Sequence, residues 1–354
     1  MNESGQREVH KELERFRKKY QEFNQQISGL SGAEEFSTPH RVIYEQGAFR
    51  LREFVDDKAS CGGEPVLIVY SHVNRPGIID IDAAHSMVRR LMDTGNRVFL
   101  MDWQRTRDED RFNSLALYVI EAIGLALDRL NELTGQSRIN LLGVCQGGTF
   151  ALCHACIQPL RIKRLGLLVT PVDFHSGDSL IRHWSRWVDF EKLARYPVNI
   201  PGRLITLMFQ LARPFDDLSR QVRLINQPVS EHGLDFMRRM DHWVYDCPDQ
   251  PGRAFAQFMQ WMYQDNALVS GTLTLGNVDV DLARVDFPVM NVYAENDHLV
   301  PPESSAALRG LINTDCYNEM RFCGGHVGLM VSARAQRDLL PELGRWLSAS
   351  RDQR

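Results

Sequence analysis

The chain has 354 residues, of which 44% are hydrophobic and 24% charged, a composition typical of a globular protein with a sizeable core. The formal net charge of −4 gives no reason to expect nucleic acid as a partner, and no window approaches the roughly 20 uninterrupted apolar residues of a membrane helix. The first residues are polar and charged, unlike a secretory signal, and seven cysteines without a regular framework indicate free thiols in a reducing cytoplasm.

The first 30 residues carry apolar side chains at spacings of three and four, which predicts an amphipathic helix. These side chains are Val9, Leu13, Phe16, Tyr20, Phe23 and Ile27. The N-terminal arm, taken as residues 1–40, either packs on its own domain or docks on a partner subunit. The alternating pattern of residues 41–55 then predicts a β-hairpin.

Short apolar segments alternate with helical patterns along most of the remaining chain. Strands are predicted at 65–70, 97–103, 139–144, 164–170, 287–294 and 319–322, with helices beginning near residue 83 and spanning about 115–134. This alternation is typical of βαβ units. We therefore expect an α/β fold with a mostly parallel central sheet and helices on both faces, formed by residues 41–174 and 284–354.

Residues 175–283 have a different character, because helix-like and irregular segments broken by proline and glycine replace the strands. Aromatic side chains gather in this block, namely Trp184, Trp187, Phe209, Phe215, Phe236, Trp243, Tyr245, Phe255, Phe258, Trp261 and Tyr263. We interpret the block as a helical cap inserted into the sheet domain over the active site, suited to an apolar acyl substrate. Additional core helices are the alternative interpretation.

The strand predicted at 139–144 runs into the motif Gly-x-Cys-x-Gly, centred on Cys145 and followed by a helix-compatible segment. This is the sequence form of a nucleophile elbow with cysteine in place of serine, which indicates an α/β-hydrolase fold. A sharp strand-to-helix turn requires small neighbours, and Gly143 and Gly147 provide them. The helix start directs N–H groups and the positive end of its dipole at the sulfur. Cys153 and Cys156 follow in helical phase and are interpreted as core residues instead of a redox pair.

An acid and a histidine follow later strands in the order expected for such a site. Asp297 comes just after the strand predicted at 287–294 and is the candidate orienting carboxylate, with Glu295 the weaker candidate. His326 lies on a glycine-bracketed loop after the final strand and is the candidate general base for Cys145. A thiolate nucleophile forms a reactive thioester, which favours acyl transfer over simple hydrolysis.

The motifs together resemble polyhydroxyalkanoate synthases, whose lipase-box variant matches Gly143-Val144-Cys145-Gln146-Gly147-Gly148. The other matching segments are Val73-Asn74-Arg75-Pro76, Met101-Asp102-Trp103, Val169-Thr170-Pro171-Val172-Asp173-Phe174, Asn199-Ile200-Pro201-Gly202, Asp249-Gln250-Pro251-Gly252, Asp297-His298-Leu299-Val300-Pro301-Pro302 and Gly324-Gly325-His326-Val327-Gly328. The resemblance runs from about residue 40 to 348, and the short chain is similar to the class III catalytic subunit. Ser71-His72 before Val73 departs from the small or apolar residues of the family.

The resemblance implies polymerisation of (R)-3-hydroxyacyl-CoA, typically 3-hydroxybutyryl-CoA, into polyester on cytoplasmic granules with release of CoA. It implies that Cys145 holds the growing chain as a thioester, that His326 is its base and that Asp297 activates the 3-hydroxyl group of the incoming unit. That last role differs from the orienting role derived above, and both stay open. Backbone N–H groups of Val73 and Gln146 would form the oxyanion hole.

Substrate contacts are also expected from His72, Asn74 and His298, although His298 has a local structural hydrogen bond as its alternative. The family resemblance further implies a second, non-catalytic synthase subunit and a homo-oligomer. No cofactor beyond the CoA of the substrate and no metal are expected, since phosphate-loop, dinucleotide and metal-ligand motifs do not occur in the sequence. The alternative functions are a cysteine-type thioesterase or polyester depolymerase, and a non-catalytic granule-binding protein.

Overall fold

A computed structural model describes residues 35–55, 63–212, 231–312, 315 and 317–349. The amphipathic helix predicted within the first 30 residues lies outside these described residues. Among the described helices, none has the length and apolar character needed to cross a membrane.

The core is an eight-stranded sheet with the order β1-β2-β4-β3-β5-β6-β9-β10. Its strands are β1 (His40–Gln46), β2 (Phe49–Phe54), β3 (Glu64–Val69), β4 (Asn96–Trp103), β5 (Ile139–Val144), β6 (Ile162–Leu168), β9 (Val289–Ala294) and β10 (Tyr317–Phe322). The β1–β2 and β2–β4 pairs are antiparallel, and all other neighbours are parallel. The predicted hairpin and mostly parallel sheet are confirmed.

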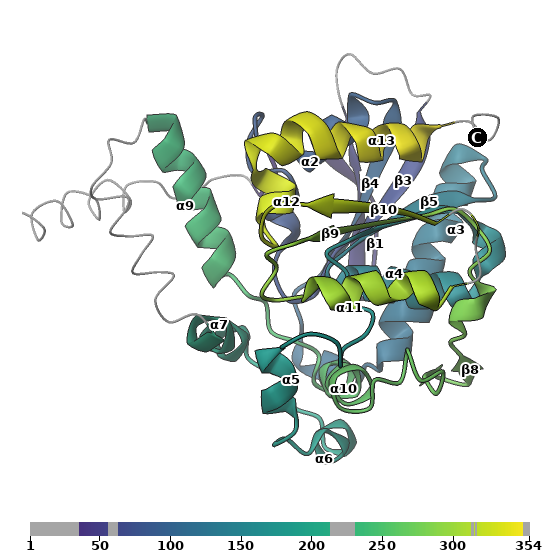
Figure 1. Cartoon of the computed structure of the whole chain (residues 1–354), viewed down its shortest axis with the longest axis vertical. Helices are drawn as coiled ribbons and strands as arrows, with labels where there is room; N and C mark the ends of the chain where they lie inside the picture. The colour runs from purple at the N-terminus through teal and green to yellow at the C-terminus, as the bar shows by residue number, and fades with distance from the viewer. Residues whose placement is uncertain (1–34, 56–62, 213–230, 313–314, 316, 350–354) are drawn as a thin grey trace, which may run out of the picture.

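Helices cover both faces of this sheet, because the central strands are apolar on both sides. One face packs on α3 (Ile123–Thr134) and α4 (Gln146–Ile157), and the other packs on α2 (Met87–Met92) and α13 (Leu340–Ser348) (Figure 1). The shorter helical segments of the core are η1 (Pro76–Ile79), η2 (Asp108–Phe112), η3 (Leu117–Ala122), η4 (Pro159–Arg161), α11 (Pro302–Ala306), η7 (Ala307–Gly310), α12 (Gly328–Val331) and η8 (Ala335–Leu339).

The helix predicted to begin near Ala83 begins later, at Met87, so that prediction was wrong by about one turn. Ser86 is the reason, since its hydroxyl accepts a hydrogen bond from the backbone N–H of Arg89 and caps the helix. Ser86 also bridges to the buried Asp80, which holds the preceding residues in a turn.

The described residues of this block, 175–212 and 231–283, form mainly helices beyond one end of the sheet, with α5, α6, α7 and α10 below the core and α9 to one side (Figure 1). The elements are α5 (Leu180–Ser185), α6 (Phe190–Arg195), α7 (Gly202–Ala212), α9 (Glu231–Tyr245), α10 (Gly252–Phe258), η5 (Met259–Gln264), β7 (Thr274–Leu275), β8 (Val278–Asp279) and η6 (Leu282–Arg284). The domain boundaries at 174 and 284 stay predictions. The described helices between them lie where a cap over the sheet edge is expected.

Candidate active site

Cys145 stands at the sharp turn between β5 and α4, with φ 54° and ψ −127°. A non-glycine residue in this region is strained, so its surroundings must fix it there. Gly147 is required because a Cβ atom at that position would lie 2.3 Å from the carbonyl oxygen of Val69. Gly143 is required because its Cβ would lie 2.4 Å from the Cα of Gly148. The backbone therefore presents the sulfur at the carboxyl edge of the sheet and at the N-terminus of α4.

His326 and Asp297 meet beside this turn, carried by the loops that follow β10 and β9. His326 Nδ1 lies 2.6 Å from Asp297 Oδ2, and Asp297 Oδ1 accepts hydrogen bonds from the N–H groups of Leu299 and Val300, both at 2.9 Å. Both oxygens of the carboxylate are thus engaged by the protein. Glu295, the weaker candidate from sequence, is exposed and forms no part of this arrangement.

The electrostatics of His326 follow from its burial and from two negative partners. Burial alone lowers the pKa of the imidazole, but the charge of Cys145, a hydrogen bond to Asp297 and one to Cys145 outweigh it and raise the pKa to about 10. The three side chains therefore form one hydrogen-bonded series from sulfur to imidazole to carboxylate. The raised pKa keeps the His326 imidazole protonated at neutral pH, between the sulfur and the carboxylate.

The two predicted oxyanion donors differ in their present partners. Gln146 is the first residue of α4, where backbone N–H groups lack an acceptor within the helix. The N–H of Val73, in contrast, donates to the Ser71 hydroxyl at 2.9 Å. Val73 can serve an oxyanion only when Ser71 releases that hydrogen bond.

The loop of Ser71 to Asn74 is clamped from two sides by amide side chains. Gln146 Oε1 accepts a hydrogen bond from the His72 N–H at 3.1 Å, and Gln250 Nε2 donates to the His72 carbonyl oxygen at 2.8 Å. Sequence reasoning assigned no role to Gln250, although it lies within one of the family-like segments. Its buried amide fixes the loop that carries Val73.

His72 is not brought to the Cys145 cavity, so the expected substrate contact from its side chain is not supported. Its ring packs edge-on against Trp103 and Tyr118, with centroids 4.4 and 4.5 Å away, and also against Phe150. Burial lowers the pKa of His72 to about 3, which keeps the imidazole neutral. The ring therefore lies among aromatic side chains, and His72 is not among the residues that line the Cys145 cavity.

Cys145 and His326 open into a cavity of about 520 Å³ whose walls come from the core loops and from described helices between residues 175 and 283. These helices contribute aromatic and aliphatic side chains, including Trp184, Phe209, Trp243, Phe255, Phe258 and Tyr263. Asn74 and His298 also line it, although the Asn74 amide donates to the Trp243 carbonyl oxygen at 3.2 Å. A cavity of this size and apolar character suits an acyl chain.

Two tyrosines lie near the sulfur: Tyr70 was predicted only as part of a strand, and Tyr263 only as one of the aromatic residues of the 175–283 block. Tyr70 and Tyr263 both line the cavity, and burial together with the charge of Cys145 raises the pKa of each hydroxyl well above its usual value. Both stay protonated near neutral pH, so each is a hydrogen-bond donor in a chamber that is mostly apolar. Only the three-dimensional fold brings them to Cys145, which explains why spacing along the chain did not reveal them.

Other expectations concern thiols and metals. Cys153 and Cys156 are buried in α4 with free thiols, and burial raises the pKa of Cys153 to about 12, as expected for core residues. Within the described part of the chain, His, Cys, Asp and Glu side chains do not gather in groups of three or more that suit a metal ion.

Comparison with known proteins adds independent information. A family model described as the alpha/beta hydrolase fold matches residues 75–333. The poly(3-hydroxyalkanoate) polymerase subunit PhaC of Allochromatium vinosum is 36% identical over 330 residues, which cover 92% of this chain and 93% of that protein. The protein of the same name from a Synechocystis species is 35% identical over 320 residues, which cover 88% of this chain and 84% of that protein.

Solved structures show the same fold at much lower identity. A monoacylglycerol lipase from Paleococcus ferrophilus has a TM-score of 0.54 at 15% identity, covering 85% of this chain and 98% of the lipase. The enol-lactonase of Burkholderia xenovorans has a TM-score of 0.53 at 15% identity, covering 88% of this chain and 100% of the lactonase. At this identity the likeness concerns the fold alone, which confirms the predicted α/β-hydrolase architecture.

Proposed function

This chain belongs to the PhaC family of poly(3-hydroxyalkanoate) polymerases with the α/β-hydrolase fold, and we propose that it polymerises (R)-3-hydroxyacyl-CoA into polyester with release of CoA. 3-Hydroxybutyryl-CoA is the proposed typical substrate. The observation that carries the mechanism is the series Cys145–His326–Asp297 at the floor of an apolar cavity of about 520 Å³.

In the acylation step, the Cys145 sulfur attacks the thioester carbonyl carbon of the substrate. A new C–S bond forms to Cys145, the C–S bond to CoA breaks, and His326 gives its proton to the departing CoA thiolate. The backbone N–H groups of Gln146 and Val73 donate hydrogen bonds to the oxyanion of the tetrahedral intermediate. The Val73 N–H becomes available once the Ser71 hydroxyl rotates away and their hydrogen bond breaks.

In the elongation step, the 3-hydroxyl group of the next hydroxyacyl-CoA attacks the chain thioester held on Cys145. A C–O bond forms, the C–S bond to Cys145 breaks, and the hydroxyl proton passes through His326 to the freed sulfur. The lengthened chain then returns to Cys145 by a second thioester exchange, which releases CoA. Asp297 either orients His326 throughout or activates the hydroxyl group directly.

This scheme uses only side chains of the protein and the CoA of the substrate, so we propose no further cofactor and no metal. A second, non-catalytic synthase subunit, self-association and attachment to a polyester granule belong to the same proposal. Purification with and without a co-expressed second subunit tests that part.

Incubation with 3-hydroxybutyryl-CoA tests the function. Free CoA with insoluble polyester supports the polymerase, whereas free CoA with monomeric acid supports a thioesterase, and no CoA release supports a granule-binding protein. Cys145→Ala should abolish CoA release while the folded state persists. Cys323→Ala, which removes an exposed free thiol at the start of the loop that carries His326, is the matched control.

A further inference from the structure

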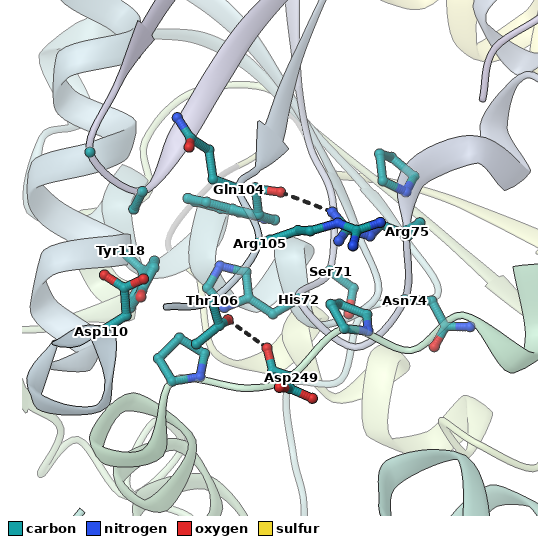
Figure 2. Close-up of a pocket in the computed structure, with 16 residues that line it drawn as sticks. Ser71, His72, Asn74, Arg75, Gln104, Arg105, Thr106, Asp110, Tyr118 and Asp249 are labelled. Carbon is teal, nitrogen blue, oxygen red and sulfur yellow. Dashed lines mark hydrogen bonds between the residues drawn. The ribbon is translucent and has the colours of Figure 1, made fainter. Parts of the chain in front are cut away.

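A second, smaller pocket adjoins the Cys145 cavity and has no role in the proposed chemistry. It holds about 30 Å³ and lies over the carboxyl ends of β3 and β4, next to the strand that ends at Cys145 (Figure 2). Ser71 and Asn74 line both spaces, so the two spaces are adjacent. Ligands of open α/β sheets bind along this same edge of the sheet.

Two arginines dominate one side of the pocket. Figure 2 shows the Arg75 and Arg105 side chains running toward one another, and both line the pocket. Arg75 Nη1 donates to the carbonyl oxygen of Trp103 at 3.4 Å. Within the described residues, neither guanidinium has a carboxylate oxygen within 4 Å. Two guanidinium groups that line one pocket and have no carboxylate partner can together bind an anion there.

The acidic residues nearby are engaged with other groups. Asp110 Oδ2 accepts from the N–H of Arg107 at 2.7 Å, and Asp249 Oδ1 accepts from the N–H of Gly202 at 2.8 Å. Glu35 lies within electrostatic range of Arg75, but the ion pair it forms is with Arg52, at 4.0 Å. Asp110 and Asp249 also line the pocket, but neither they nor Glu35 forms a direct ion pair with Arg75 or Arg105 among the described residues.

A buried polar atom provides a second, independent sign of a ligand. The His72 ring lines the pocket, its residue is 8% exposed, and its Nε2 atom has no hydrogen-bond partner among the described residues. A buried nitrogen without a partner is costly unless a water or ligand fills the space beside it. At about 30 Å³ the pocket admits only the oxygen end of a group, and the remainder lies at its mouth beside the arginines.

We propose that Arg75 and Arg105 bind phosphate groups of the nucleotide end of the acyl-CoA substrate, while its thioester lies at Cys145. This inference rests on the proposed function for the choice of substrate. Guanidinium groups match phosphate oxygens in pairs, and a protein of net charge −4 needs a local positive site for a polyanionic substrate.

The distances along the fold fit the shape of CoA. β4, which leads to Arg105, is two strands away from β5, or about 10 Å at the usual strand spacing. Arg75 is two residues beyond Val73, a chain span of at most about 7 Å. The pantetheine arm, which separates the thioester sulfur from the first phosphate, bridges this interval between the cavity and the pocket mouth.

Truncation of the substrate tests the proposal. The specificity ratio, kcat/KM for 3-hydroxybutyryl-CoA over kcat/KM for 3-hydroxybutyryl-pantetheine, is measured for wild type, Arg75→Gln and Arg105→Gln. Loss of a charge-assisted hydrogen bond should lower this ratio by about 10- to 100-fold in each variant. Arg129→Gln, which removes one exposed charge on α3 away from the pocket, is the matched control and should keep the wild-type ratio.

A ratio equal to that of wild type in both arginine variants would overturn the proposal, as would an equal loss on both substrates. Arg75→Lys and melting curves separate lost binding from lost folding, because the lysine keeps the charge and should recover part of the ratio. Calorimetry of Cys145→Ala with CoA, dephospho-CoA, pantetheine and inorganic phosphate distinguishes the nucleotide from free phosphate. If wild type forms no polyester yet binds CoA through the arginines, the proposed function fails and the phosphate site stands.

Discussion

Replacing Asp297 by asparagine separates the two roles that the sequence left open for this residue. The carboxylate accepts three hydrogen bonds, one from His326 at 2.6 Å and two from the N–H groups of Leu299 and Val300. An asparagine has one oxygen, so its NH₂ group must face either the two backbone donors or the imidazole. Facing the imidazole, it forces the tautomer in which Nε2 carries the proton and cannot accept one from Cys145.

The magnitude follows from the hydrogen bond between His326 and the carboxylate, which the substitution removes. A buried hydrogen bond to a charged group contributes about 1.5–3 kcal/mol, which corresponds to a roughly 10- to 150-fold slower reaction of the Cys145 thiol. The wrong tautomer adds to this loss, and in serine enzymes the equivalent change costs about 10⁴ in kcat. We therefore expect Asp297→Asn to slow alkylation of Cys145 by at least about tenfold at neutral pH.

Alkylation by iodoacetamide is the decisive assay because it involves no substrate hydroxyl group. If Asp297 orients His326, alkylation, the first release of CoA and elongation should all slow. If Asp297 acts on the 3-hydroxyl group alone, alkylation and the first release of CoA stay at the wild-type rate and only elongation is lost. Glu295→Gln, which removes an exposed carboxylate two residues away, is the control. An unchanged alkylation rate in Asp297→Asn would refute the orienting role.

Four further predictions concern Ser71, Gly148 and His326. Ser71→Ala frees the Val73 N–H and should raise kcat/KM by about 2- to 12-fold in steady-state assays, whereas no increase argues against Val73 as an oxyanion donor. Gly148→Ala places a Cβ 1.9 Å from Thr170 Oγ1. The free energy of unfolding measured in urea should therefore fall by about 1–3 kcal/mol, and adding Thr170→Ala should restore part of it. A Gly148→Ala variant as stable as wild type would contradict this packing. Because folding raises the pKa of His326 to about 10, the protonated imidazole stabilises the fold. This contribution is complete below about pH 6.5 and is lost as the pH rises toward 10. The Tm difference between wild type and His326→Gln should therefore shrink as the pH rises from about 6.5 to about 10. The same variant should alkylate more slowly at pH 7, and an equal rate would refute the sulfur–imidazole pair.

Sequence patterns predicted the sheet well because buried parallel strands are nearly continuous apolar runs, as in β3, β5 and β9. The chain order of Cys145, Asp297 and His326 also placed these residues correctly at the carboxyl edge, since each follows a strand of the same parallel sheet. Their catalytic roles stay predictions until they are measured.

The directions in which side chains point could not be predicted from the sequence. A histidine next to the predicted oxyanion loop suggests a substrate contact. The His72 ring instead packs against Trp103 and Tyr118 and lines the smaller, adjoining pocket. Likewise, no spacing rule predicts that the Ser71 hydroxyl accepts a hydrogen bond from the Val73 N–H, because this depends on one side-chain rotamer within a four-residue loop.

The choice between polymer and free acid depends on the cavity more than on the nucleophile. In the proposed mechanism, the thioester on Cys145 would react with whichever hydroxyl reaches it, and water would have the advantage of concentration unless the chamber excludes it. Cap side chains such as Trp184, Phe255 and Phe258 line the chamber with apolar surface, while Tyr70 and Tyr263 supply donors that can position a substrate hydroxyl. A substrate hydroxyl held next to the thioester in this way reacts as fast as a free alcohol would at a very high concentration. Truncation of the apolar cap side chains should therefore increase the share of 3-hydroxy acid among the products before it reduces CoA release.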